Sequence, residues 1–185
     1  MINDVYSDVK TRMKKAIESL QTDMNSVRAG RATPSLLDRI MVEYYGAQTP
    51  LNQLANISAP EPRLLVVQPW DKSVIPEVEK AILKSDLGLT PNNDGTVIRL
   101  AIPALTQERR NELVRYVKQK GEEGKVAIRN IRRDGNDTVK SLEKNNEISE
   151  DESRKAQEEI QKITDEFIKE ADIVIENKEQ EILEV

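Results

Sequence analysis

Residues 106–145 decide the fold and read TQERRNELVRYVKQKGEEGKVAIRNIRRDGNDTVKSLEKN. Their apolar positions recur every three or four residues, a spacing typical of one face of a long helix. These positions are Leu113, Val117, Gly124, Ile128, Ile131, Val139 and Leu142. Thr106 is placed to cap the helix, and Glu108 lies in its first turn, where negative charge is favourable. A helix with a single apolar stripe must bury that stripe against other helices.

Two other segments have the same helical pattern. Residues 2–29 carry one apolar stripe, and Gly30 stands where a helix C-terminal glycine is expected. A further helix is predicted to begin at Ser149, because Glu152 completes a capping box with that serine. Its stripe comprises Ala156, Ile160, Ile163, Phe167, Ala171 and Val174. The economical arrangement of three one-faced helices is a three-helix bundle.

The segment between the first two helices has a different composition. Residues 31–105 hold all eight prolines and the single tryptophan. Short apolar runs at 40–45, 63–67 and 96–102 are bounded by the turn-type sequences GAQTP, APEP and PNNDG, which indicates strands. A short helical turn is predicted from Thr33-Pro34 to Leu37, and a longer helix from Ser73 to Ser85, with Gly88 near its end. Trp70 is expected to anchor the packing of this segment, with base stacking as the alternative.

These patterns predict an α+β protein. An elongated three-helix bundle, residues 1–30 and 106–185, is interrupted by a small α/β domain of β/α/β type, residues 31–105. The two chain crossings, near 30–31 and 103–105, are candidate hinges: Gly30, Arg31, Pro103, Ala104 and Leu105.

The residue content argues against an enzyme. The chain has no cysteine and no histidine, which removes thiolate and Ser-His chemistry and nearly all zinc sites. There is no glycine-rich phosphate loop. Glu150, Asp151 and Glu152 are explained as a helix N-terminus, and residues 92–95 as a turn, because the acidic ligand of a calcium loop is missing downstream. We therefore expect no catalytic residues, metal or cofactor. With neither a membrane span nor a signal peptide, a cytoplasmic protein is expected.

Positive charge is concentrated in one segment of an acidic chain. Lys and Arg total 28 against 33 Asp and Glu, yet residues 106–133 hold nine basic and four acidic residues. Residues 134–185 hold seven and seventeen. With about 100° per residue, the basic residues share a broad face away from the apolar stripe. They are Arg115, Lys118, Lys125, Arg129, Arg132, Arg133 and Lys140.

Several roles for this basic face remain open. Ion pairing along the helix explains Arg133, which has Asp137 four residues on, but Arg129 and Arg132 have no acid at such spacings. The compensating charge then comes from the acidic third helix or from an external anion, and the planar guanidinium suits RNA phosphate. A scaffold protein that binds an acidic protein surface is the alternative function. A hydrolase or transferase comes third.

Four blocks of the sequence resemble the ribosome recycling factor family. They are VRAGRATPSLLD (27–38), the stretch from PEVEK to RNELV (76–114), KVAIRNIRRDGND (125–137) and ISEDESRKAQEEIQKITDEFI (148–168). The blocks occur in the family's order, and the resemblance extends over essentially the whole chain. The resemblance implies an L-shaped pair of domains and no enzymatic activity. It also implies that the factor splits post-termination ribosomes into subunits together with elongation factor G and GTP, releasing messenger RNA and deacylated transfer RNA.

The resemblance also implies the partners and the binding residues. The bundle is expected to dock on large-subunit ribosomal RNA at the intersubunit face, as a monomer and without DNA or membrane. The arginines carried over from the family blocks are Arg28, Arg31, Arg110, Arg129, Arg132 and Arg133, and the basic face adds Lys118 and Lys125. Gly135 departs from the family pattern, which favours alanine, and glycine within a helix costs roughly 1 kcal/mol relative to alanine.

Overall fold

The computed structural model describes residues 1–28 and 30–184 of the chain. It divides into two compact units. The first consists of Met1–Arg28 together with Gln107–Glu184, and the second is formed by the chain between them. Long helices in one unit and a sheet in the other confirm the α+β class.

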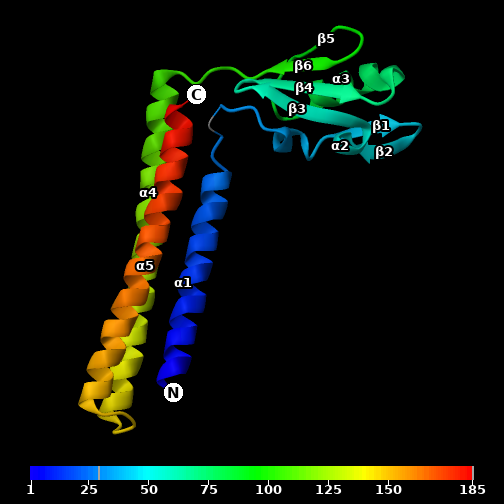
Figure 1. The fold of residues 1–185 in the computed structure, drawn as a ribbon. Coiled ribbons are helices and arrows are strands. Elements are labelled where there is room, and N and C mark those ends of the chain that lie inside the picture. Colours follow the sequence, from blue (N-terminus) through cyan, green and yellow to red (C-terminus); the bar gives the residue numbers. More distant parts are fainter. Residues whose placement is uncertain (29, 185) are drawn as a thin grey trace. The chain divides into compact units, whose positions relative to one another are not determined.

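The first unit is a bundle of three long helices. They are α1 (Ile2–Asn25), α4 (Gln107–Lys144) and α5 (Glu150–Leu183), and they lie side by side (Figure 1). Their buried residues follow the predicted stripes closely, with Val117, Ile128 and Val139 of α4 fully buried. Phe167 and Val174 of α5 are only half-buried. The helical periodicity therefore identified the faces that form the bundle core.

Glycines let the helices approach α4 closely. A Cβ atom added to Gly135 would lie 2.8 Å from Cγ2 of Val9, and one added to Gly121 would overlap the side chain of Ile175. Both glycines are buried. Gly135 therefore has a packing role on α1, which offsets the helix-propensity cost expected from the sequence.

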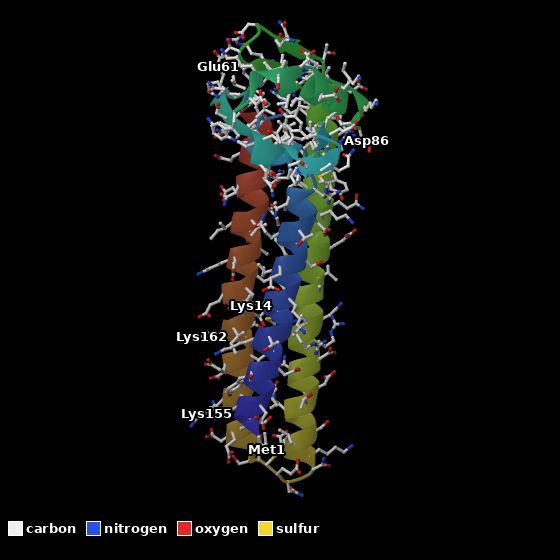
Figure 2. The ribbon with its side chains drawn as sticks, turned by 90° about the vertical axis from the view of Figure 1, so that its right-hand side faces the viewer. Met1, Lys14, Glu61, Asp86, Lys155 and Lys162 are labelled. Carbon is white, nitrogen blue, oxygen red and sulfur yellow. The ribbon has the colours of Figure 1, made fainter. Side chains whose placement is uncertain are left out.

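Ser149 caps the start of α5, as predicted, but Glu152 contacts the serine hydroxyl and not the backbone N–H of Ser149 that a capping box would use. The Ser149 hydroxyl oxygen accepts a hydrogen bond from the backbone N–H of Glu152 at 3.0 Å, and the same hydroxyl donates to Glu152 Oε1 at 3.2 Å. Asp151 pairs with Arg154 at 2.7 Å and with Lys155 at 3.1 Å. Figure 2 shows Lys155 at this end of α5. The three consecutive acids thus begin a helix.

The predicted end of the first helix is wrong. The sequence pattern extends it to residue 29 with Gly30 as the stop, whereas α1 ends at Asn25 and Ser26 caps it. The Ser26 hydroxyl donates to the carbonyl of Asp23 at 2.7 Å, and such local side-chain bonds compete with further helix. Gly30 does have a positive φ of 75°, but it lies beyond the helix.

The second unit is built on an antiparallel sheet. Its strands are β3 (Ala55–Glu61), β4 (Leu64–Pro69), β6 (Ile98–Ala101) and β5 (Pro91–Asn93), in that spatial order. Because β4 and β5 both pair antiparallel with β6, they run parallel to each other. The helix α3 (Ile75–Lys84) connects them, which gives the β/α/β connection expected from the sequence.

Shorter elements complete the second unit. Strands β1 (Met41–Tyr44) and β2 (Ala47–Pro50) form a separate hairpin. Helix α2 (Leu51–Leu54) follows it. Two single turns of 3-10 helix are η1 (Pro34–Leu37) and η2 (Lys72–Val74), and η1 has Thr33 at its N-cap position as predicted.

Three strands lie where the sequence indicated turns. The predicted runs contain β1, β6 and the first four residues of β4, but β2, β3 and β5 fall in or beside GAQTP, APEP and PNNDG. Strands β3 and β5 are the two edges of the sheet. At an edge a proline such as Pro60 or Pro91 removes no necessary hydrogen bond, so proline there did not exclude a strand.

Trp70 is not the packing anchor that the sequence suggested. Its side chain is 72% exposed. In β4 the side chains of Leu65, Val67 and Pro69 point inward, so the following residue points outward. The core of this unit is aliphatic instead, and includes Leu37, Ile82 and Leu100 among others.

The turn predicted at 92–95 is confirmed only in part, because Asn92 and Asn93 belong to β5 and the connection to β6 is made by residues 94–97. Asp94 accepts hydrogen bonds from the backbone N–H groups of Thr96 and Val97 at 2.9 Å each and from Arg99 Nη1 at 2.8 Å. The two backbone bonds are the main reason why the pKa of the Asp94 carboxyl is held far below its usual range.

We predict that Ser149→Ala lowers the free energy of unfolding by about 1 kcal/mol, because the N–H of Glu152 loses its cap. Chemical denaturation of the full chain measures this change. Ser141→Ala, an exposed serine within α4, is the matched control and should change stability by less than about 0.5 kcal/mol. Equal losses in the two variants would contradict the capping role.

We predict that Asp94→Asn destabilises the protein at neutral pH but not in strong acid. A carboxyl with a depressed folded pKa stabilises the fold above its unfolded pKa of about 3.9, and this contribution is lost as the pH falls through the folded value. Thermal unfolding of both proteins between neutral pH and strong acid measures the difference in their stability. A difference in stability that stays constant as the pH falls would contradict the prediction.

Candidate functional site

The basic face of α4 borders α5. Lys118, Arg129 and Arg133 are exposed, whereas Lys125 and Arg132 are half-buried where α4 meets α5. Both half-buried residues contact α5 side chains. The bundle therefore brings five of the eight candidate RNA-binding residues together on one helix face.

Two of these cations have acidic partners. Lys125 pairs with Asp172 of α5, so the acidic third helix does supply one counter-charge. Arg129 Nη1 lies 3.2 Å from Glu122 Oε1, an acid two helical turns earlier. No acid lies three or four residues from Arg129, but its long side chain reaches beyond these spacings to an acid on its own helix.

Arg132 has a neutral partner. Its Nη1 donates a hydrogen bond to Oε1 of Gln161 on α5 at 3.2 Å, and its Nε is buried. Within residues 1–28 and 30–184, no ion pair is formed by Arg132. Its guanidinium charge is therefore held in place without being neutralised.

Arg133 does not form the ion pair suggested by the sequence. In the part of the chain that the structure describes, no bridge joins it to Asp137, and its side chain is exposed. An exposed pair of this kind gains little, because solvent screens the charges and two long side chains lose rotamer freedom. Arg133 thus presents its charge to solvent.

The other arginine candidates lie elsewhere. Arg110 is half-buried near the start of α4, and Arg28 is exposed after the end of α1. Arg31 is exposed in the second unit. These three do not belong to the cluster of five on α4.

The hinge candidates include two residues in contact. A Cβ added to Gly30 would lie 3.0 Å from Cγ of Leu105. The chain segment that follows α1 therefore contacts the segment that precedes α4. Gly30 also has φ 75°, a conformation that L side chains rarely adopt. Arg31, Pro103 and Ala104 are exposed.

The described residues show no clustered metal ligands. Among residues 1–28 and 30–184, no group of three or more acidic residues is placed to hold a metal ion. Nor is any helix among them long and apolar enough to cross a membrane. The feature that stands out is a cationic helix face, and the chemistry that such a face offers is anion binding.

Comparison with known proteins identifies the family. The family model described as "Ribosome recycling factor" matches residues 20–183. The chain is 65% identical over 181 residues to the ribosome-recycling factor of Natranaerobius thermophilus, covering 98% of each chain. It is 58% identical over 185 residues to that of Bacillus subtilis, covering both chains in full.

Solved structures agree with this result. The solution structure of a ribosome recycling factor matches with a TM-score of 0.74 and 41% identity, over 100% of this chain and 98% of the other. A second match, with a TM-score of 0.64, 52% identity and 99% of each chain covered, is the T. thermophilus factor. That structure is described as models of the factor and of E. coli elongation factor G bound to the E. coli post-termination complex.

The chain has the α+β architecture of translation factors whose solved structures it matches over nearly its whole length. It belongs to the ribosome recycling factor family. The resemblance seen in the sequence blocks is thereby confirmed.

Proposed function

We propose that this protein splits the post-termination ribosome into subunits together with elongation factor G and GTP, releasing messenger RNA and deacylated transfer RNA. Family membership over the whole chain supports this role. So does the structural relative described with elongation factor G on a post-termination complex. The place of action is the cytoplasm, and the acting form is a monomer.

The bundle docks through the basic face of α4 on large-subunit ribosomal RNA at the intersubunit face. The observation that carries this assignment is Arg132, a guanidinium held by Gln161 with no acidic partner among the described residues. Arginine's planar fork matches phosphate oxygens, and a charge that the protein does not neutralise gains most from them. Arg129, Arg133, Lys118 and Lys125 flank it, and Arg28, Arg31 and Arg110 provide further contacts.

The second unit moves about the two connecting segments. Gly30 and Arg31 on one crossing, with Pro103, Ala104 and Leu105 on the other, form the hinge in this proposal. Elongation factor G pushes the second unit, and the bundle transmits the motion to the contacts between the subunits. The factor itself catalyses no covalent reaction and needs no cofactor, because elongation factor G hydrolyses the GTP.

We predict that the protein converts polysomes to subunits or monosomes only when elongation factor G and GTP are both present. Sucrose-gradient profiles of polysomes treated with puromycin measure the conversion. Omission of GTP is the control. If the profile did not change with all components present, the protein would be a ribosome-binding module without recycling activity.

We predict that Arg132→Ala weakens binding to large subunits about tenfold, a loss of about 1.4 kcal/mol, with the helical content unchanged. One phosphate contact fewer should also reduce the slope of log affinity against log salt by about 0.7–0.9. Sedimentation binding at several salt concentrations measures both quantities.

Lys162→Ala is the charge-matched control for this experiment. Lys162 is exposed on α5 (Figure 2) and makes no ion pair in the described part of the chain. Its removal should leave affinity within about twofold of wild type. Equal losses for Arg132→Ala and Lys162→Ala would indicate general electrostatic attraction instead of a docking site.

A further inference from the structure

The side chain that holds Arg132 is itself held. Gln161 Oε1 accepts from Arg132 Nη1 at 3.2 Å, and Gln161 Nε2 donates to Asp165 Oδ1 at 2.9 Å. A guanidinium can only donate, and an ionised carboxylate can only accept. The orientation of the Gln161 amide is therefore defined at both ends, with its carbonyl toward Arg132.

This arrangement differs from that of the neighbouring cations. Lys125 and Arg129 have carboxylate partners in Asp172 and Glu122. A carboxylate orients a cation but cancels much of its field, whereas a neutral amide orients it and leaves its net charge in place. Through Gln161, α5 restrains Arg132 without placing a carboxylate directly on its guanidinium.

We propose that Gln161 is a positioning residue for phosphate recognition by Arg132. It restricts the guanidinium before binding, so that less rotamer freedom is lost when a phosphate arrives. Asp165 prevents the Gln161 amide from turning its NH₂ group toward the arginine. The inference rests on the proposed docking of α4 on ribosomal RNA.

Gln161→Glu tests this role sharply. A carboxylate at this position keeps the contact with Arg132 but cancels much of the guanidinium charge. The variant therefore tests whether the partner of Arg132 must be neutral for phosphate binding. If so, affinity for large subunits should fall about tenfold, and the slope of log affinity against log salt should drop by about 0.7–0.9, as for Arg132→Ala.

Gln161→Ala removes the hydrogen bond but leaves the charge. We expect a loss of about threefold, the size of one ordinary hydrogen bond, with an unchanged salt slope. Gln180, an exposed glutamine on the same helix, provides the matched controls. Gln180→Glu and Gln180→Ala should both stay within about twofold of wild type, and circular dichroism melting verifies that every variant folds.

Double variants show whether the effect passes through Arg132. In the Arg132→Ala background, Gln161→Glu and Gln161→Ala should change affinity by less than about twofold. Fully additive losses of affinity in the double variants would overturn the inference. So would wild-type affinity for Gln161→Glu if Arg132→Ala alone binds weakly. Both results leave the proposed function intact. Wild-type affinity for Arg132→Ala itself would instead overturn the docking proposal.

If Gln161→Glu does not fold, the affinity of Gln161→Ala for large subunits tests the positioning role by itself. A loss of about threefold that disappears in the Arg132→Ala background supports the positioning role. The same loss in both backgrounds overturns it.

Discussion

The structure of the first unit depends on burial of the single apolar stripe of α4. Val117, Ile128 and Val139 are fully buried, and covering them requires both α1 and α5. Burial of each such side chain is worth about 1.5–3 kcal/mol, far more than the few tenths of a kcal/mol that repulsion between neighbouring arginines costs. The stripe therefore sets the rotation of α4, and the basic residues take the remaining positions on the helix.

The position of α5 then decides how much positive charge remains. Residues 134–185 carry seventeen acidic side chains, enough to neutralise the basic face if all of them faced it. In the structure α5 places Asp172 on Lys125 but an uncharged glutamine on Arg132. Neutralisation by the acidic helix therefore applies to Lys125, and the anion binding that we propose concerns a different cation, Arg132.

Much of the fold follows from local rules visible in the sequence. The stripes of α4 and α5, the N-cap at Ser149 and the turn at Asp94 all depend on residues a few positions apart. The errors concern features that depend on distant parts of the chain. Whether Pro60 lies in a turn or in an edge strand depends on which strands pair around it, and the exposure of Trp70 depends on which face of β4 is covered.

For the cationic face, too, contacts that depend on distant parts of the chain could not be predicted from the sequence. Periodicity placed Lys118, Lys125, Arg129, Arg132 and Arg133 on one side of a helix, and the family resemblance singled out the arginines. The partner of Arg132, by contrast, could not be read from spacing, because Gln161 comes from another helix and its pairing depends on how α4 and α5 pack. Glu122 was missed for a different reason, since a seven-residue spacing lies outside the usual helical pair rules.

The order of the elements along the chain has a consequence for biosynthesis. The second unit is one continuous segment, whereas α1 is separated from its bundle partners by that whole segment. During synthesis α1 leaves the ribosome first but has no helix to pack against until α4 has followed. All strands of the second unit are synthesised before α4, so this unit can form its core while the apolar stripe of α1 is still exposed.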